Sequence, residues 1–208
     1  MRKERQTERR QMEDDKKRET RKEVLSWVRM FTIVIVVVFV LTQFIIINAR
    51  IPSGSMENTI MTHDRLIGFR FAYWFDEPQR GDIILFEYPV DEKQIYIKRV
   101  IGLPGETVEI RDGHIYIDGS DEPLQEDYLK EEWTWENDGY TFVVPEGCYF
   151  VLGDNRNDSE DGRFWAGLAL KSGVASTPAE AEQYSYVRKD QIKGKAIFKY
   201  YSKFAILK

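Results

Sequence analysis

The sequence contains one cysteine and two histidines among 208 residues. The single cysteine, Cys148, excludes a disulfide bond within the chain, and its place in an apolar, strand-like run indicates a packed side chain rather than a nucleophile. The two histidines, His63 and His114, are the only candidates for the base of a Ser-His-Asp triad, and the residues around them do not single out either one. A serine hydrolase of the usual triad type is therefore the weaker hypothesis.

A basic stripe is also missing from most of the chain. The first 29 residues carry 11 Lys and Arg against 7 Asp and Glu, whereas the rest of the chain carries 19 against 28. The positive charge is concentrated in the N-terminal tail, and the remainder is acidic. An acidic domain without a basic face argues against nucleic acid as a partner.

One long apolar run is present, MFTIVIVVVFVLTQFIII at residues 30–47, and it contains no charged residue. As a helix it would span about 27 Å, close to the ~30 Å hydrocarbon core of a bilayer. The cations before the run greatly outnumber those just after it, so the positive-inside rule places the N-terminus in the cytoplasm. We expect a cytoplasmic basic tail (1–29), a single transmembrane helix in the lipid bilayer (30–47) and an extracytoplasmic domain (48–208).

The segment after the run predicts a mainly β, antiparallel domain. Short stretches rich in β-branched and aromatic residues alternate with turns that contain Gly and Pro. The predicted strands are residues 81–88, 94–102, 106–110, 114–119, 140–145, 148–153 and 195–201. Two polar, weakly patterned stretches, 120–139 and 170–188, are expected to be surface insertions.

A short polar stretch, IPSGSMENTI at residues 51–60, follows the apolar run closely. Its Pro and Gly suit a tight turn, so the simplest interpretation is a flexible join between the anchor and the domain. Ser53 and Ser55 gain chemical interest only if a base lies near them, because a serine hydroxyl is a weak nucleophile until it is activated.

The predicted strand QIYIKRVIG, residues 94–102, offers such a base. Strand alternation places Lys98 and Arg99 on opposite faces, so whichever face turns inward carries a cation among apolar groups. A buried lysine loses its proton more readily and can serve a serine as general base, whereas arginine stays charged. A sheet edge whose long side chains reach solvent is the alternative. If Lys98 is the base, Arg99→Lys should impair activity far less than Lys98→Arg.

A dense polar segment, GDNRNDSEDGRFWAG at residues 153–167, resembles a calcium loop at first sight. The EF-hand pattern fails, because one register puts Arg156 at a ligand position and the other puts Glu160 where glycine is needed. We expect no metal here and no cofactor. Asp161 and Arg163 are available to form an ion pair.

Four motifs together resemble a known family. PSGSM, RGDIILF, YIKRVIGLPGE and GDNRNDSEDGRFW follow an N-terminal anchor in this order, over roughly residues 30–202, and the chain is similar to bacterial type I signal peptidases. The single anchor resembles the Gram-positive form. The resemblance implies a serine endopeptidase of the bacterial cell membrane that cuts signal peptides from secretory pre-proteins after small residues. Glu106, where the family often has Asp, and the 170–188 stretch depart from the pattern.

The resemblance also assigns roles to residues. Ser55 is implied as the nucleophile and Lys98 as its general base, with the Ser53 hydroxyl and the Ser55 backbone N–H forming the oxyanion hole. Ser159 is implied to hydrogen-bond Lys98. The implied supporting residues are Asp154, Asp161 and Arg163, and the implied substrate-pocket residues are Ile51, Met56, Ile60, Tyr96 and Ile97. Two alternatives remain open: a tethered β-domain that only binds a partner, and a hydrolase based on His63 or His114.

Overall fold

A computed structural model describes residues 2–133, 139–200 and 204–207, and the chain divides into two units, Met1–Ile45 and Ile46–Lys208. The first unit is a helix, α1 (Arg2–Val40), whose last turn continues as a π-helix, Leu41–Ile45. No Gly or Pro occurs in the first 50 residues, so nothing in the sequence interrupts the helical hydrogen bonds. The charged tail is thus helical from Arg2 onward.

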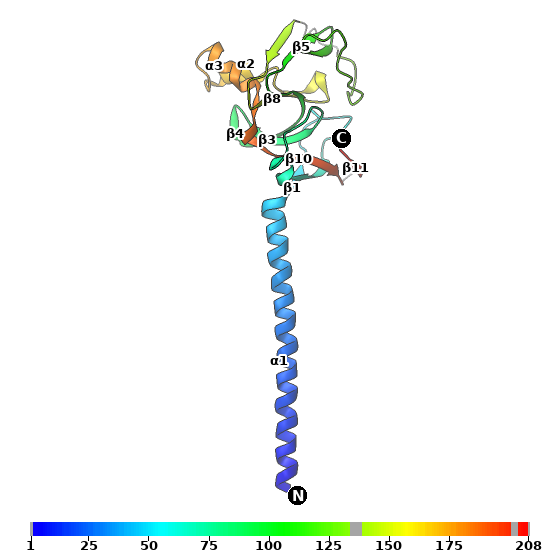
Figure 1. The fold of residues 1–208 in the computed structure, drawn as a ribbon, viewed down its shortest axis with the longest axis vertical. Coiled ribbons are helices and arrows are strands. Elements are labelled where there is room, and N and C mark those ends of the chain that lie inside the picture. Colours follow the sequence, from blue (N-terminus) through cyan, green and yellow to red (C-terminus); the bar gives the residue numbers. More distant parts are fainter. Residues whose placement is uncertain (1, 134–138, 201–203, 208) are drawn as a thin grey trace. The chain divides into compact units, whose positions relative to one another are not determined.

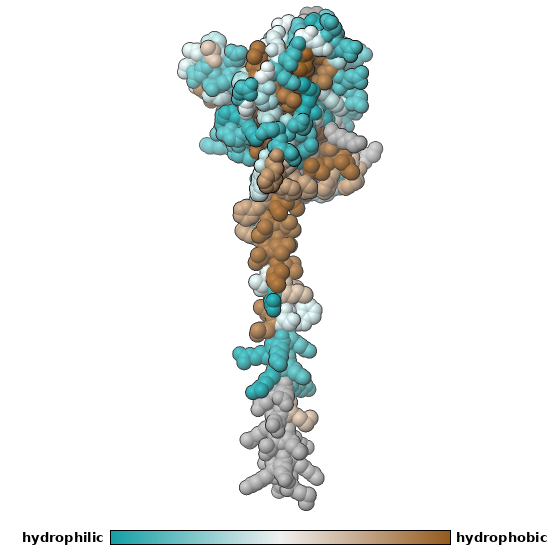
Figure 2. Space-filling model, viewed as in Figure 1, coloured by the Kyte–Doolittle hydropathy of each residue, from teal (hydrophilic) through white to brown (hydrophobic). Residues whose placement is uncertain are grey.

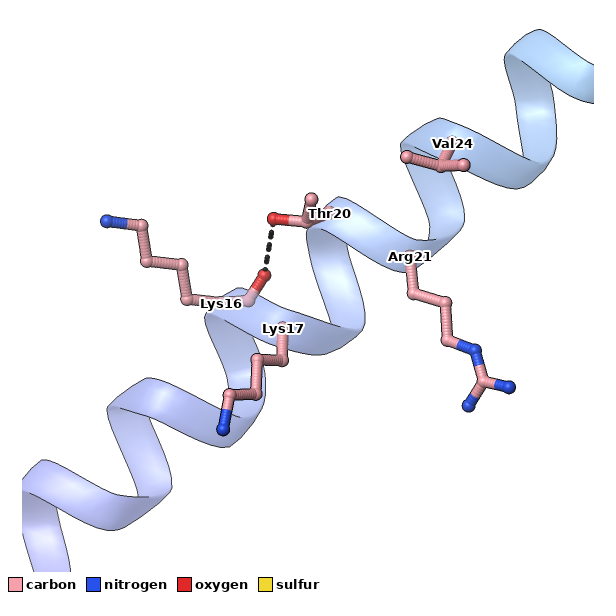
Figure 3. Close-up of a pocket in the computed structure, with 5 residues that line it drawn as sticks. All are labelled: Lys16, Lys17, Thr20, Arg21 and Val24. Carbon is pink, nitrogen blue, oxygen red and sulfur yellow. Dashed lines mark hydrogen bonds between the residues drawn. The ribbon is translucent and has the colours of Figure 1, made fainter.

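Lys16–Ile45 is the one helix in the described part of the chain that is long and apolar enough to cross a membrane. Figure 2 shows apolar surface over its C-terminal portion and hydrophilic surface over the segment before it. In that segment Lys16, Lys17 and Arg21 project from the helix, and the Thr20 hydroxyl donates to the Lys16 carbonyl at 2.9 Å (Figure 3). The helix ends at Ile45 rather than at residue 47 as predicted.

The helix ends early because the next residues pair as a strand. β1 (Ile46–Arg50) and β2 (Arg65–Phe69) are antiparallel, and Ile46 lies opposite Phe69. The further strands of the main sheet are β3 (Ile83–Tyr88), β4 (Asp91–Gly102), β8 (Cys148–Leu152), β9 (Val187–Arg188), β10 (Ile192–Lys199) and β11 (Ala205–Ile206). Their order is β1-β2-β10-β3-β4-β8-β9, with β11 paired to β10, and neighbouring strands in this order are antiparallel.

A smaller three-stranded sheet has the order β6-β5-β7. Its strands are β5 (Thr107–Arg111), β6 (His114–Ile117) and β7 (Tyr140–Val143). The helical elements of the unit are α2 (Trp165–Ser172), α3 (Pro178–Glu182) and the short 3₁₀ turns Arg70–Tyr73, Arg156–Asp158, Gln183–Ser185 and Lys189–Gln191. Figure 1 shows α2 and α3 together at one side of this unit, away from β10 and β11. The mainly β, antiparallel fold class is confirmed.

The sheet is covered on both faces around β3 and the second half of β4. On β3, Ile83 and Leu85 belong to one hydrophobic cluster, whereas Ile84 and Phe86 belong to another that contains Trp165. On β4 every residue from Ile97 to Gly102 is buried. Both Lys98 and Arg99 are therefore enclosed, and the expectation of a single inward-facing cation was incomplete.

The two predicted surface insertions also contribute to the interior. Between residues 170 and 188, Ala175 and Ala181 pack with Ala169 in a small apolar cluster, and Val187 lies in the main core. In the other stretch, Leu124 and Trp133 pack against the core cluster around Phe150. Residues 134–138 of that stretch lie outside the described residues.

Candidate active site

Ser55 lies in the loop between β1 and β2, at residues 51–64. Backbone bonds from Ile51 N–H to Asp64 O (2.9 Å) and from His63 N–H to Ile51 O (2.8 Å) close the base of this loop. Met56 and Ile60 are fully buried and fix the loop from beneath. The turn proposed as a flexible join is thus anchored by its apolar residues, and Ser55 is itself buried.

Lys98 reaches this serine from the middle of β4. Its Nζ donates a hydrogen bond to Ser55 Oγ at 2.7 Å, and the lysine side chain is almost wholly buried. Burial lowers the pKa of Lys98 to about 8, although the negative charges of Asp161, Glu160 and Asp154 act in the opposite direction. The site therefore holds a serine hydroxyl next to an amine that is readily deprotonated.

The other two serines of the site have different surroundings. Ser53 Oγ lies 3.5 Å from Ser55 Oγ, on the exposed side of the loop. Ser159 Oγ donates to Asp161 Oδ2 at 2.7 Å. Among the described contacts Ser159 makes no hydrogen bond to Lys98, so the implied direct contact is not present in this structure.

The loop after β8 is hydrogen-bonded to backbone carbonyls of the serine loop. Asn155 donates twice, from its backbone N–H to Ser55 O and from Nδ2 to Gly54 O, both at 3.0 Å. Gly153 permits this approach, because a Cβ there would lie 2.4 Å from Ser55 O and 2.2 Å from Ser159 Oγ. Neither Gly153 nor Asn155 was singled out from the sequence, although both belong to the GDNRNDSEDGRFW motif.

Asp161 is the buried acceptor at the centre of that loop. It pairs with Arg163 Nε at 2.8 Å, which confirms the predicted ion pair, and it accepts from Gly153 N–H at 3.0 Å. Burial alone would raise the pKa of Asp161, but Arg163 and the hydrogen bonds from Gly153 and Ser159 outweigh it, and the pKa is lowered. The carboxylate is therefore ionised and fixes both ends of the loop.

Asp154 forms a second buried ion pair with Arg99. Arg99 Nε and Nη2 donate to its two carboxylate oxygens at 2.8 and 2.7 Å, and Thr59 Oγ1 donates at 2.5 Å. Arg99 also donates to Gly81 O at 2.7 Å. Because Asp154 follows β8 while Thr59 belongs to the serine loop, this pair joins the strands to the loop that carries Ser55.

A cavity of about 470 Å³ opens beside the Ser55–Lys98 pair. The lining residues are Pro52, Ser53, Gly54, Ser55, Gln94, Ile95, Tyr96, Ile97, Lys98, Asp158 and Glu160. Of the implied pocket residues, Tyr96 and Ile97 line it, whereas Ile51, Met56 and Ile60 are buried in the core cluster that also contains Ile97. These three residues are not part of the lining, so they can influence the shape of the cavity only indirectly, by supporting residues such as Ile97.

Neither histidine contacts the serine. His63 Nδ1 lies 3.5 Å from the Arg50 guanidinium, and His114 Nδ1 lies 2.7 Å from Asp112 O. Both are outside the lining of the cavity. Of the possible bases, the structure thus brings Lys98 to Ser55 and leaves the histidines elsewhere.

Known proteins resemble this chain closely. The family described as signal peptidase, peptidase S26, matches residues 24–201. A probable signal peptidase I-1 of Synechocystis sp. is 43% identical over 143 residues, which cover 65% of this chain and 71% of that protein. Signal peptidase I of Bacillus licheniformis is 34% identical over 175 residues, which cover 80% and 92%. A solved signal peptidase I from Enterococcus faecalis is 37% identical and covers 58% of this chain and 97% of its own, with a TM-score of 0.42.

The family match over most of the chain and the signal peptidases among its relatives indicate a serine peptidase. The chain belongs to the signal peptidase family, peptidase S26, and is of the signal peptidase I type. The resemblance seen in the four sequence motifs is confirmed.

Proposed function

We propose that this chain is a membrane-anchored endopeptidase that removes signal peptides from secretory pre-proteins, with Ser55 as nucleophile and Lys98 as general base. The observation that carries the proposal is the 2.7 Å hydrogen bond between Lys98 Nζ and Ser55 Oγ. It is supported by the burial that lowers the pKa of Lys98 to about 8. A free lysine, with a pKa of ~10.4, would be almost entirely protonated near neutral pH and could not accept the serine proton.

In acylation the neutral amine of Lys98 takes the proton of Ser55 as Oγ attacks the carbonyl carbon of the scissile bond. The developing oxyanion would accept hydrogen bonds from the Ser53 hydroxyl and the Ser55 backbone N–H. The Lys98 ammonium then gives its proton to the leaving amine, and an ester to Ser55 remains. In deacylation the neutral Lys98 amine takes a proton from water as the water oxygen attacks the ester carbon. The bond to Ser55 Oγ then breaks, Oγ takes the proton back from Lys98, and the signal peptide leaves with a free C-terminal carboxylate.

The supporting residues keep this geometry. Asp161, held by Arg163, accepts from Ser159 and from Gly153 N–H, while Asp154, held by Arg99, accepts from Thr59 in the serine loop. Ser159 therefore acts on the site through Asp161.

The cavity favours small side chains in the substrate. Tyr96 and Ile97 line the cavity next to the nucleophile, and Ile97 also packs in a core cluster with the buried residues Ile51, Met56 and Ile60. An extended segment with alanine-like residues at positions −1 and −3 relative to the cut would fit such a wall. We propose that α1 crosses the bilayer with its basic end in the cytoplasm, so that the cavity works on the opposite side.

The test uses the detergent-solubilised full chain and a purified secretory precursor, with mapping of the new N-terminus by mass spectrometry. We expect one cut at the end of the signal peptide and no cut with Ser55→Ala. Cleavage elsewhere, or cleavage that survives Ser55→Ala, would refute the proposal. A variant with both histidines replaced by alanine serves as the control and should still cut the precursor.

A further inference from the structure

The catalytic cavity has charged groups on its wall that the proposed reaction does not use. Asp158 and Glu160 line it from the loop that follows β8. The cation in the lining is Lys98, whose pKa is lowered to about 8 by burial. When Lys98 is neutral, which is the form that acts as a base, the lining carries negative charge only.

Glu160 is exposed and lies beside an aromatic stack. The Tyr96 hydroxyl lies 3.5 Å from Glu160 Oε1, to which it donates. The Tyr96 ring stacks on Tyr88 with centroids 4.3 Å apart and planes at 1°, and Trp165 packs edge-on against both rings. Burial and, next, the charge of Glu160 raise the pKa of both tyrosines, so their hydroxyls stay protonated and face the carboxylate as donors.

Asp158, the other carboxylate of the lining, differs in this respect. Among the described residues no hydrogen bond of its side chain is found and its charge acts on Lys130, whereas Glu160 accepts a hydrogen bond from Tyr96 inside the cavity wall. A charged group that is oriented before the ligand arrives loses less conformational freedom on binding. Of the two carboxylates in the wall, Glu160 is thus the one with a hydrogen-bonding partner in the wall itself.

We propose that Glu160 is a specificity-determining residue, which favours substrates that carry a lysine or arginine close to the scissile bond and disfavours acidic residues there. The inference rests on the proposed function, because it requires an extended polypeptide in the cavity.

Tyr96 lies between Glu160 and the catalytic pair. Its hydroxyl is 3.5 Å from Glu160 Oε1, and the centre of its ring is 5.6 Å from Lys98 Nζ. An extended chain advances about 3.3 Å per residue, so the selected side chain belongs within a few residues of the cut bond. Positions −1 and −3 are assigned to small residues, which leaves −2, +1 and +2 as the positions to test.

The test uses the full-length chain in detergent and peptides that span a signal-peptide cleavage site. At each tested position the peptides carry Lys, Gln or Glu, and the measured quantity is the kcat/KM ratio of the Lys peptide to the Glu peptide. An effect common to both peptides, such as a change in Lys98, cancels in this ratio. At low ionic strength we expect a ratio of about three- to ten-fold at one position, the size of a solvent-accessible charge pair, and a decline with added salt.

Substitutions assign the effect to one residue. Glu160→Gln should bring the ratio close to one, and Glu160→Lys should invert it. The matched control, Asp158→Asn, removes the other carboxylate of the wall and should keep the wild-type ratio.

Each other outcome has a defined meaning. Equal ratios in wild type and Glu160→Gln would overturn charge selection by Glu160 while leaving the proposed function intact, because the Gln peptide is still cut at the same bond. A ratio lost in Asp158→Asn but kept in Glu160→Gln would also overturn it. If the wild-type chain cuts none of the peptides, the proposed function fails and this inference fails with it.

Discussion

At the scale of single residues, the proposed chemistry depends on whether Lys98 can be neutral while it contacts Ser55. Lys98 lies among residues that are buried on both faces of β4, so its ammonium form is poorly solvated. Three carboxylates nearby limit the shift, since Asp161, Glu160 and Asp154 each favour the charged form. The result is an amine with a pKa near the pH range in which an enzyme works.

Replacing either member of the pair should stop turnover. We expect Ser55→Ala, Lys98→Met and Lys98→Arg each to lower kcat by at least about 10³-fold, as is usual when a group that acts within a catalytic unit is lost. Lys98→Arg keeps the positive charge but has no neutral form that could accept a proton. Cleavage of a fluorogenic signal-peptide substrate measures the effect, and circular dichroism checks the fold. Near-normal turnover by Lys98→Arg would make Lys98 a structural cation.

The lowered pKa of Lys98 also predicts two pH dependences. The pKa falls from 10.5 to about 8, so kcat/KM should rise with pH through about 8 and level off above it. Below pH 8 the folded protein bears the full penalty of a buried ammonium, which at 1.36 kcal/mol per pKa unit is roughly 3 kcal/mol. Between about pH 8 and 10.5 the unfolded chain binds a proton that the folded chain does not, so the free energy of unfolding rises with pH.

Lys98→Met separates the stability effect from the activity. It should be more stable than the wild type at pH 7, and the difference should shrink as the pH approaches 10.5. Thermal unfolding in detergent at a series of pH values measures the difference. A gap that stays constant across this range would show that the pKa of Lys98 is not lowered by folding.

Arg99 requires a revised expectation. Its two hydrogen bonds to Asp154 form a buried, two-point ion pair, and its guanidinium lies 3.9 Å from the centre of the Tyr128 ring. A lysine cannot donate to both carboxylate oxygens of Asp154 in this two-point geometry, so Arg99→Lys should destabilise the protein by about 2 to 4 kcal/mol. Arg188→Lys is the matched control, because Arg188 is exposed and should change stability by less than about 0.5 kcal/mol. A loss of less than about 1 kcal/mol in Arg99→Lys, measured by chemical denaturation, would contradict this structural role of Arg99.

The sequence singled out the candidate reacting residues, whose roles stay a prediction, but not the contacts that hold them. Ser55, Lys98 and the ion pair between Asp161 and Arg163 follow from motifs in which neighbours along the chain carry the information. The pair of Arg99 with Asp154 joins positions 55 residues apart. A period-two pattern assigns faces to a strand, but it gives no indication that both faces will be covered.

At the scale of elements, the stretch 120–139 shows the largest departure from prediction. In its described part, Glu126 forms a buried ion pair with Arg156, and Tyr128 donates to Glu126 at 2.7 Å. Asn58 of the serine loop donates to the carbonyls of Tyr128 and Leu129 at 3.1 Å. This segment therefore braces both active-site loops.

Loss of the buried pair should destabilise the protein strongly. Glu126→Ala leaves the Arg156 guanidinium enclosed without its counter-charge, and we expect a loss of about 3 to 5 kcal/mol in the free energy of unfolding. Lys130→Ala is the control from the same segment, since its pair with Glu57 is partly exposed and should contribute less than about 1 kcal/mol. A loss of less than about 1 kcal/mol in Glu126→Ala would show that the buried pair does not brace the loops.

Strands with several β-branched or aromatic residues were found from the sequence, and the short or interrupted ones were not. β2 contains Gly68, which weakens the strand signal, yet Gly68 is needed because a Cβ there would lie 2.9 Å from Lys195 O. β1 was hidden in the apolar run, since Ile46 and Ile47 suit a membrane helix as well as a strand. Its pairing with β2 is a tertiary contact that hydropathy alone does not report.

At the scale of the whole molecule, an acidic β unit and a basic helical tail are carried by one chain. The peptidase family and the antiparallel fold agree with the sequence-based expectation. The charges that flank the apolar run predict on which side of a membrane the β unit lies, and this prediction can be tested directly.

The 11 cations that precede the apolar run should keep the N-terminus in the cytoplasm, while Arg50 is the only cation in the few residues that follow the run. Protease added to intact spheroplasts should therefore degrade a C-terminal tag and spare an N-terminal one, and immunoblotting of both tags measures the result. Permeabilised cells serve as the control, because both tags should then be lost. Replacing Lys16, Lys17, Arg21, Lys22 and Arg29 by glutamine should weaken the preference and yield a fraction with the opposite orientation. A protected C-terminal tag in the wild type would place the catalytic cavity in the cytoplasm, where exported signal peptides are not processed, and would refute the proposed orientation.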